Sequence, residues 1–177
     1  MDLKFKYVKS SIKESGNLIG HFIMSDLEAG QSLTIGNALR RVLLSNLEGT
    51  AITAIRIPGA AHEFATIPGI RDDILEILLN LKQIILKTAE KKPFSGKIIA
   101  KGPGIITANC LKFENDVKVI NPTQYIATIS NNIDIELEIK AERGTGYQFG
   151  DQVNQKYIGF LNIDAVFMPV VNVNYKI

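Results

Sequence analysis

One stretch of this 177-residue sequence, GNALRRVLLSNLEG at residues 36–49, carries apolar side chains on two sides of a predicted helix. Spacings of i, i+3, i+4 and i+8, typical of a helix lying on a core, define a first stripe of Leu39, Val42, Leu43 and Leu47. A second stripe on another side contains Arg41, Leu44 and Glu48. This is more apolar surface than one core needs, so we expect the helix to contact other chains as well.

The predicted ends of this helix carry residues that suit capping. Ser32 or Thr34 can accept a hydrogen bond from a free backbone N–H at the start, and Gly49 suits the left-handed residue just past the end. The preceding residues alternate apolar and polar side chains around a short polar break at residues 14–16. This alternation predicts two strands of a hairpin, at residues 3–11 and 17–27.

The stretch RDDILEILLNLKQ predicts a second helix. Its main apolar stripe repeats at helical spacing and contains Ile70, Ile74, Ile77, Leu78 and Leu81. Asp72 and Asp73 in the expected first turn and Lys82 in the last turn match the helix dipole. Two leucines lie off this stripe and make the helix apolar on more than one side, namely Leu75 and Leu79.

The remainder of the sequence consists of short β-rich runs separated by turn residues. The run TAITAIRI at residues 50–57 ends at the turn pair Pro58-Gly59. Later runs lie at residues 84–88, 96–102, 105–110, 117–122, 125–130, 133–144 and 157–177. The predicted fold class is therefore α+β, with a few helices packed on antiparallel sheets.

The composition indicates a folded protein. Hydrophobic residues make up 46% of the sequence and charged residues 21%, and the formal net charge is +2. The basic residues are dispersed, unlike the dense basic surface of a nucleic-acid groove. No apolar run approaches the length of about 20 residues that spans a bilayer, so we expect no membrane association. One cysteine, Cys110, and two histidines give no ligand set for structural zinc, and we expect no metal and no cofactor.

Residues with catalytic potential form no recognisable catalytic set, and we assign no catalytic residue. His62-Glu63 opens like a zinc-protease motif, but Thr66 stands where the second histidine belongs. Three carboxylates alternate with apolar residues and therefore share one strand face, at Asp134, Glu136 and Glu138. We interpret that face as solvated rather than as a catalytic pair or a cation site.

The remaining candidates are also interpreted structurally. The loop with Gly144, Gly146 and Gly150 follows a strand but precedes no helix N-terminus, so we expect a turn and not a phosphate site. His21, in an apolar strand, is expected to be a hydrogen-bonded structural histidine. Cys110 is expected to be a buried small side chain.

Residues 27–82 closely resemble the N-terminal assembly domain of the α subunit of bacterial-type RNA polymerase. The motifs GNALRRVLLS, HEF-T-PG and DILEILLNLK stand in the order and spacing of that family. Weaker resemblance continues through GPGIITA, VINPTQYIATI, AERGTGY and IGFLNIDAVFMPV towards the end of the chain. The sequence is most similar to the plastid and cyanobacterial branch.

This resemblance implies a fold of two lobes. Residues 1–49 would form the first segment of a dimerisation lobe, residues 50–164 an inserted lobe that contacts the β subunit, and residues 165–177 the start of the return segment. Members of this family are not enzymes by themselves; they dimerise and form the platform for the β and β′ subunits. The sequence stops where the family's return segment would continue, so we expect a truncated or split form, in which dimerisation is an open question.

The resemblance also implies roles for individual residues. The dimer and core side of the first helix would contain Leu39, Val42, Leu43 and Leu47. Contacts to the β subunit would come from Arg41, Leu44, His62, Glu63, Phe64 and Thr66. Lys82 matches a position on the β′ side. Arginine suits such a contact because its planar guanidinium group can bind carboxylates or carbonyls in a bidentate manner.

Three alternative functions remain open at this point. One is a non-catalytic homodimeric interaction domain, and another is a small hydrolase that uses His62 and Glu63. The third is a nucleic-acid-binding module, indicated only by the isoelectric point near 8.6. DNA would be reached only through the assembled polymerase. The abundance of isoleucine, lysine and asparagine favours a plastid origin, with the stroma as the expected location and the bacterial cytoplasm as the alternative.

Overall fold

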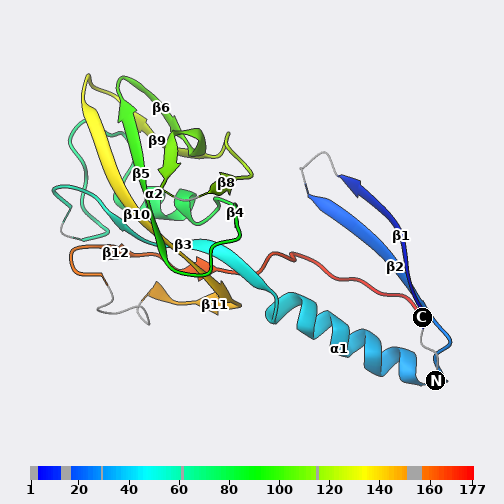
Figure 1. Ribbon diagram of the computed structural model, residues 1–177. Coiled ribbons are helices and arrows are strands. Elements are labelled where there is room, and N and C mark those ends of the chain that lie inside the picture. The colour runs from blue at the N-terminus through cyan, green and yellow to red at the C-terminus, as the bar shows by residue number, and fades with distance from the viewer. Residues whose placement is uncertain (1–3, 13–16, 29, 61, 115, 151–156) are drawn as a thin grey trace. The chain divides into compact units, whose positions relative to one another are not determined.

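The computed structural model describes residues 4–12, 17–28, 30–60, 62–114, 116–150 and 157–177. The chain divides into two compact units, one of Met1–Val42 with Val173–Ile177 and one of Leu43–Asn172. Most elements of both units are labelled in Figure 1. Mostly antiparallel strands with two α-helices confirm the predicted α+β class. Within the described part of the chain, both helices fall short of the length and apolarity that a membrane-spanning helix needs.

The first unit contains an antiparallel hairpin of β1 (Lys4–Ile12) and β2 (Leu18–Ser25). This confirms the two predicted strands; the predicted turn at residues 14–16 lies outside the described residues. Phe22 stacks on Phe5 with ring centroids 5.3 Å apart and lies 5.5 Å from Tyr7. These aromatic residues share one face of the hairpin because residues of the same parity point to the same side of a strand.

Helix α1 (Gln31–Ser45) begins and ends earlier than the apolar pattern predicts. At its start, the Glu28 N–H donates to Gln31 Oε1 at 3.2 Å, Gln31 Nε2 donates to the Glu28 carboxylate at 3.1 Å, and the Gln31 N–H donates to the Glu28 carbonyl oxygen at 3.1 Å. The predicted caps Ser32 and Thr34 are wrong, because both residues lie inside the helix.

The predicted C-terminus of α1 is also wrong. Leu47 lies in the bend after the helix, and Gly49 lies in strand β3 (Glu48–Arg56) rather than at a helix cap. Helical spacing could not show this, because the residues that hold Gly49 in a strand come from distant parts of the sequence. On the helix itself, Gly36 gives room for Tyr175, whose ring would lie 2.7 Å from a Cβ at this position. The Tyr175 hydroxyl donates to Asn37 Oδ1 at 2.7 Å.

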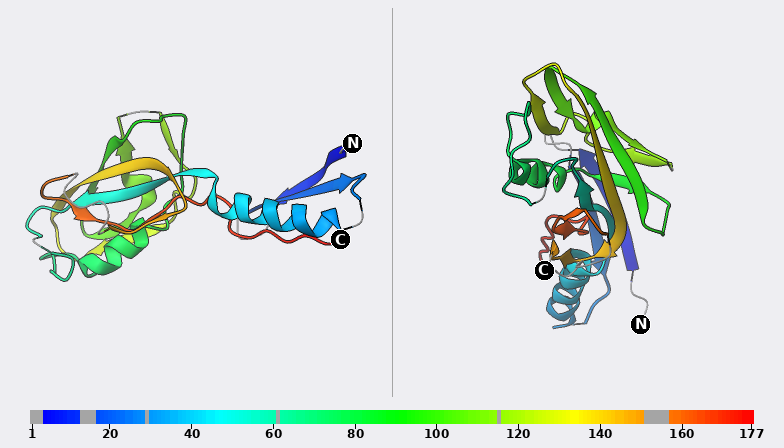
Figure 2. Two further views of the ribbon diagram at one scale, coloured as in Figure 1. Left: turned by 90° about the horizontal axis from the view of Figure 1, so that it is seen from below. Right: turned by 90° about the vertical axis from the view of Figure 1, so that its left-hand side faces the viewer.

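The second unit is built on a five-stranded antiparallel sheet with the order β12-β3-β10-β5-β7 (Figures 1 and 2). Its members besides β3 are β5 (Phe94–Lys101), β7 (Leu111–Phe113), β10 (Asp134–Thr145) and β12 (Leu161–Asn162). Three two-stranded sheets accompany it. They pair β4 (Leu86–Thr88) with β8 (Val117–Val119), β6 (Gly104–Thr107) with β9 (Tyr125–Ile129), and β11 (Tyr147–Gln148) with β13 (Ala165–Val166).

Cys110 ends a short 3₁₀ helix, Ala108–Cys110, that follows β6 where a continuous strand was predicted. Its side chain is half-buried and packs against the core, so it is less buried than expected. The core itself is formed by residues of β3, β5, β9 and β10 together with α2 (Ile74–Leu81). Burial alternates along β5 and β10, whereas five consecutive residues of β3 are buried. The largest fully buried side chains include Ile52, Ile55, Ile74, Ile77, Leu81, Ile98, Ile126, Leu137 and Ile139.

Helix α2 confirms the predicted main stripe at four of its five positions. The exception is Ile70, which lies before the helix and forms a β-bridge with Ile129. Leu75 and Leu79 are exposed on the opposite side, as the sequence predicts. Asn80 Nδ2 donates to the carbonyl oxygen of Ile126 at 3.0 Å and thereby joins α2 to β9.

Asp72 does not lie in the first turn of α2, so the predicted dipole pairing is wrong for this residue. It precedes the helix, is 7% exposed, and accepts hydrogen bonds from the Tyr125 hydroxyl at 2.8 Å and from the Thr128 backbone N–H at 2.6 Å. Asp73 occupies the N-cap position without a side-chain cap bond. A buried carboxylate is stable only when such donors replace water, and these donors fix the start of α2 against β9.

A pair of glycines forms a notch in the large sheet. Gly49 in β3 lies directly opposite Gly144 in β10. A Cβ at Gly144 would lie 2.8 Å from the Phe167 ring, and one at Gly49 would overlap the Phe167 carbonyl oxygen. Phe167, which is 3% exposed, therefore packs against the sheet only because neither position carries a side chain.

This packing predicts that Gly49→Ala lowers the free energy of unfolding by about 1–3 kcal/mol, because backbone must move to admit the methyl group. Chemical denaturation monitored by circular dichroism measures this loss. Gly104→Ala is the matched control, since a Cβ there meets no atom within 4 Å. Equal stability of the two variants would contradict the account of the notch.

Candidate functional site

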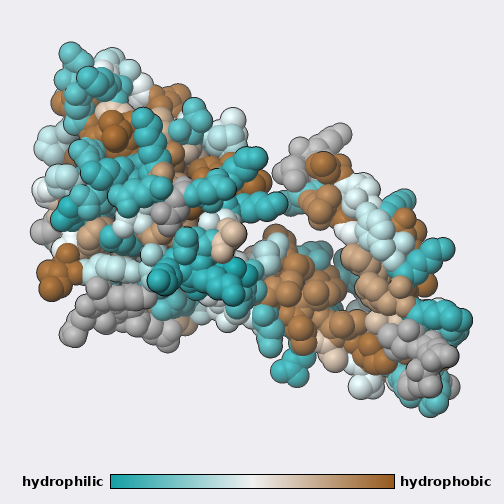
Figure 3. All heavy atoms as spheres, in the orientation of Figure 1, coloured by the Kyte–Doolittle hydropathy of each residue, from teal (hydrophilic) through white to brown (hydrophobic). Residues whose placement is uncertain are grey.

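Helix α1 exposes apolar side chains along its length. None of its residues is buried, and Leu33, Leu39 and Val42 are 55%, 41% and 48% exposed. Leu43 and Leu44 are half-buried. Figure 3 shows hydrophobic side chains gathered over this helix. An exposed apolar helix face of this kind is typical of a surface that another protein covers.

Arg41 lies on α1 with its side chain at the surface, next in sequence to the exposed Arg40. Leu44 follows Arg41 by three residues on the same side of the helix. The two residues expected to contact the β subunit from this helix are therefore close together, whereas Leu47 is separated from Leu39 and Val42 by the end of the helix.

The segment His62–Thr66 forms an exposed turn in the second unit. The Ala65 N–H donates to the carbonyl oxygen of His62 at 3.2 Å, which closes the turn. His62, Glu63 and Thr66 are exposed, and the Phe64 ring is 73% exposed. A phenyl ring presented in this way leaves most of its apolar surface in water and is suited to insertion into an apolar site of a partner.

Lys82, at the C-terminal end of α2, is part of a polar network. Its ammonium group donates to the Tyr147 hydroxyl at 2.9 Å and lies 3.5 Å from Asp164 Oδ2. Tyr147 in turn donates to Asp164 Oδ2 at 2.6 Å, and the Gly150 N–H donates to the other carboxylate oxygen at 2.8 Å. The network joins α2 to strand β11 and to the residue before β13.

The pKa values of this network reflect these contacts. Burial acts to lower the pKa of Lys82, but the hydrogen bond to Tyr147 and the negative charge of Asp164 outweigh burial and raise it. The hydrogen bonds from Tyr147 and from the Gly150 N–H hold the pKa of Asp164 below its ordinary value. The network therefore favours the charged forms of both end residues.

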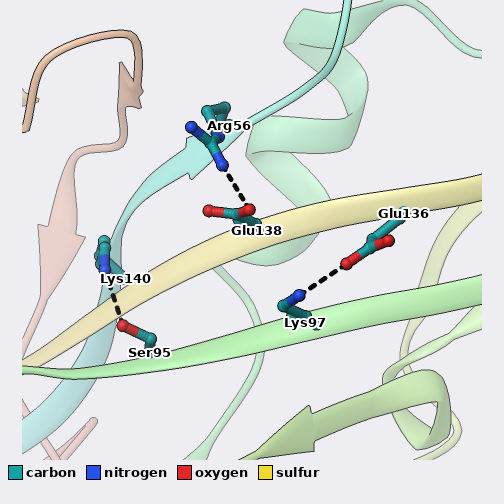
Figure 4. Close-up of polar contacts among 6 residues, drawn as sticks. All are labelled: Arg56, Ser95, Lys97, Glu136, Glu138 and Lys140. Carbon is teal, nitrogen blue, oxygen red and sulfur yellow. Dashed lines mark hydrogen bonds and ion pairs between the residues drawn. The ribbon is translucent and has the colours of Figure 1, made fainter.

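The outer face of the large sheet carries cross-strand ion pairs (Figure 4). Arg56 bonds to Glu138, Lys97 Nζ lies 2.7 Å from Glu136, and Lys101 Nζ lies 3.3 Å from Asp134. The three carboxylates do share one strand face, as the alternation predicts. Each is neutralised by a cation from a neighbouring strand, so they do not form a pair of carboxylates that could share a proton.

The described residues do not bring a catalytic set together. His62 and Glu63 lie on an exposed turn, and no group of three or more histidine, cysteine, aspartate or glutamate residues in the described segments could hold a metal ion. Gly146, with φ of 67°, lies in the turn between β10 and β11, as predicted, whereas Gly144 of the same predicted turn lies within β10 and pairs with Gly49. The features that stand out among the described residues are therefore exposed surfaces.

Sequence reasoning missed the partners of Lys82. Tyr147 and Asp164 lie 65 and 82 residues further along the chain, and neither belongs to a periodic pattern with Lys82. The same is true of Asp72 and Tyr125, 53 residues apart. Only the tertiary fold brings these polar groups together.

Comparison with known families gives a match over residues 55–168 to the RNA polymerase Rpb3/RpoA insert domain. This match covers the last two residues of β3, the other strands of the large sheet, α2 and the Lys82 network. It ends one residue after Phe167, which packs on the glycine pair.

Named relatives resemble nearly the whole chain. A DNA-directed RNA polymerase subunit alpha from Trieres chinensis is 51% identical over 173 residues, which cover 97% of this chain and 55% of the relative. The subunit alpha of Trichormus variabilis is 48% identical over 96% of this chain and 55% of its own length, and that of Pyropia yezoensis is 50% identical over 89% and 51%. The chain spans about half the length of these relatives.

The Lys82 network predicts a pH-dependent contribution to stability. Because the folded-state pKa of Asp164 is lowered, its contribution is present above the ordinary value of 3.8 and is lost as pH falls through the folded-state value. Asp164→Asn should therefore lower the free energy of unfolding at pH 7 by at most about 1 kcal/mol, since the group is partly exposed. Urea titrations between pH 7 and pH 3 should show this difference shrinking as the pH falls.

Asp134→Asn is the control, because both Asp134 and its ion-pair partner Lys101 are exposed to solvent. It should change stability less than Asp164→Asn does at pH 7. A difference for Asp164→Asn that grows as the pH falls would contradict the proposed direction.

Proposed function

Because this chain belongs to the RNA polymerase Rpb3/RpoA insert-domain family, we propose that it is an assembly subunit of DNA-directed RNA polymerase. The family match carries this proposal. The subunit is non-catalytic by itself, requires no cofactor, and forms a platform for the large β and β′ subunits. It reaches DNA only through the assembled enzyme. The exposed apolar surfaces support such a role, since assembly requires surface that partners can cover.

Self-association is assigned to α1. Leu39 and Val42 expose apolar surface on this helix, and Leu43 next to them is half-buried. Two copies that bury these side chains against each other would remove them from water, at about 25 cal/mol per Å² of apolar surface. The dimer would then present two equivalent platforms, one for each large subunit.

Contacts to the β subunit are assigned to two places. Arg41 and Leu44 provide a cation and an apolar side chain on one side of α1, and the exposed turn provides His62, Glu63 and Phe64, followed by Thr66. An arginine and an exposed aromatic ring are the side chains most often found at energetic centres of interfaces.

Lys82 is assigned to the β′ side. Its hydrogen bond to Tyr147 and its proximity to Asp164 hold the ammonium group in one position, and Tyr147 and Phe149 beside it remain exposed. A preorganised group loses less conformational entropy on binding than a free lysine does.

The relatives from algae and cyanobacteria support a plastid or bacterial cytoplasmic location. Of these two we propose the plastid stroma, because isoleucine, lysine and asparagine are abundant in the sequence. Expression of a tagged chain in the source cells with fluorescence imaging tests this assignment.

The β-subunit assignment predicts that Arg41→Ala weakens capture of the large β subunit about 30-fold, equivalent to about 2 kcal/mol. The free energy of unfolding should stay within about 0.5 kcal/mol, since a charge at the surface of a helix contributes little to folding. Surface plasmon resonance with immobilised chain measures the capture.

Arg40→Ala provides the control, because Arg40 is an exposed arginine one position earlier on the same helix. It should change the affinity less than about threefold. Equal effects of the two substitutions on affinity would contradict the assignment of Arg41 to the β contact. Failure of the unaltered chain to capture β would contradict the proposed function itself.

The dimer assignment predicts that Leu39→Asp lowers the mass of the chain from dimer towards monomer in light scattering after gel filtration. A charge at this position would have to be desolvated in the interface. Leu79→Asp, at an exposed leucine on α2, should leave the mass unchanged. A monomeric unaltered chain would contradict self-association through α1.

A further inference from the structure

A row of charged residues crosses four strands of the large sheet. Glu138 in β10 lies directly opposite Arg56 in β3 on one side and Lys97 in β5 on the other. Lys97 in turn lies directly opposite Lys112 in β7, the edge strand. The charges along the row are therefore positive, negative, positive and positive.

The carboxylates of this face are already engaged by the inner cations. Glu138 bonds to Arg56, and Glu136 lies 2.7 Å from Lys97 Nζ (Figure 4). The hydrogen bond and charge of Glu136 raise the pKa of Lys97. None of the ion pairs among the described residues includes Lys112. Like charges directly opposite each other on a sheet are destabilising, so the row lacks a carboxylate at its outer end.

A shallow hollow of about 290 Å³ lies beside the two opposed lysines. Its lining includes Ser95, Lys97, Ile99, Lys112, Glu114, Glu138 and Lys140. Lys140 Nζ is held by the Ser95 hydroxyl at 2.6 Å, and Ile99 is 49% exposed. The hollow thus offers ammonium groups next to an exposed apolar side chain.

We propose that Lys112 and Lys97 bind an aspartate or glutamate side chain of a partner protein, with an adjacent apolar residue of that partner packing on Ile99. The partner carboxylate completes the alternation of charge along the row. A protein segment fits better than nucleic acid, because Glu114 and Glu136 would repel a continuous line of phosphates. This surface is separate from the residues assigned to the β and β′ subunits, and it goes beyond the proposed function.

The test uses the whole chain and a fluorescein-labelled peptide with one glutamate beside leucine in an otherwise uncharged sequence, followed by fluorescence anisotropy at low salt. Lys112→Ala should weaken binding about fivefold, and Lys112→Glu should abolish it. The matched control is Lys118→Ala, because Lys118 is an exposed lysine that also lies opposite a lysine, Lys87, on the separate β4–β8 sheet. It should leave the affinity unchanged.

A second readout separates this role from a structural one. Lys112→Glu places a carboxylate opposite Lys97, so it should raise the thermal unfolding midpoint of the chain while it removes peptide binding. A lowered midpoint would overturn the proposal that the row lacks a carboxylate.

Three further outcomes would overturn the binding proposal. These are equal affinity for a peptide with glutamine in place of glutamate, an equal loss in Lys118→Ala, and tighter binding of a single-stranded DNA oligonucleotide than of the acidic peptide. Capture of the β subunit by Lys112→Glu should be unaffected, which distinguishes failure here from failure of the proposed function.

Discussion

The packing of Phe167 on the glycine pair is the contact on which the arrangement of the second unit depends. It brings three distant parts of the sequence together, because Gly49 lies in β3, Gly144 in β10, and Phe167 follows β13. The Phe167 N–H also donates to the carbonyl oxygen of Gly146 at 2.9 Å, so both backbone and ring are fixed. Since β3 begins three residues after α1 ends, a helix that continued to Gly49 would be incompatible with this contact.

Two carboxylates that each accept several hydrogen bonds join secondary-structure elements to one another. Asp72 fixes the start of α2 against β9, and Asp164 fixes β11 near the end of α2. Apolar groups are nevertheless left exposed at the surface, among them side chains on α1 and the ring of Phe64 on a turn. Exposed apolar groups of this kind suit a protein that works by being covered by others.

The sequence predicted those features that depend on local periodicity. Both helices exist because their apolar residues repeat at helical spacing, and β10 matches its prediction closely because a period of two persists over its 12 residues. The ends of α1, the position of Asp72 and the partners of Lys82 could not be predicted, since each depends on residues far away in the sequence. Strands β7 and β11 have only three and two residues, too few to show any period. The contacts assigned to Arg41, Phe64 and Lys82 remain predictions.

The outermost strands of the large sheet are short, which affects how readily a strand of another molecule can pair with them. In the described part of the large sheet, the edges are β12 with two residues and β7 with three. Edges this short offer few unpaired backbone groups, so they are poor templates for a strand from another molecule and reduce the hazard of aggregation. A subunit that must expose apolar surface before its partners arrive benefits from this arrangement. Apolar side chains are exposed on α1, on the Phe64 turn and also on the β1–β2 hairpin, so the short edges limit strand recruitment at the large sheet alone.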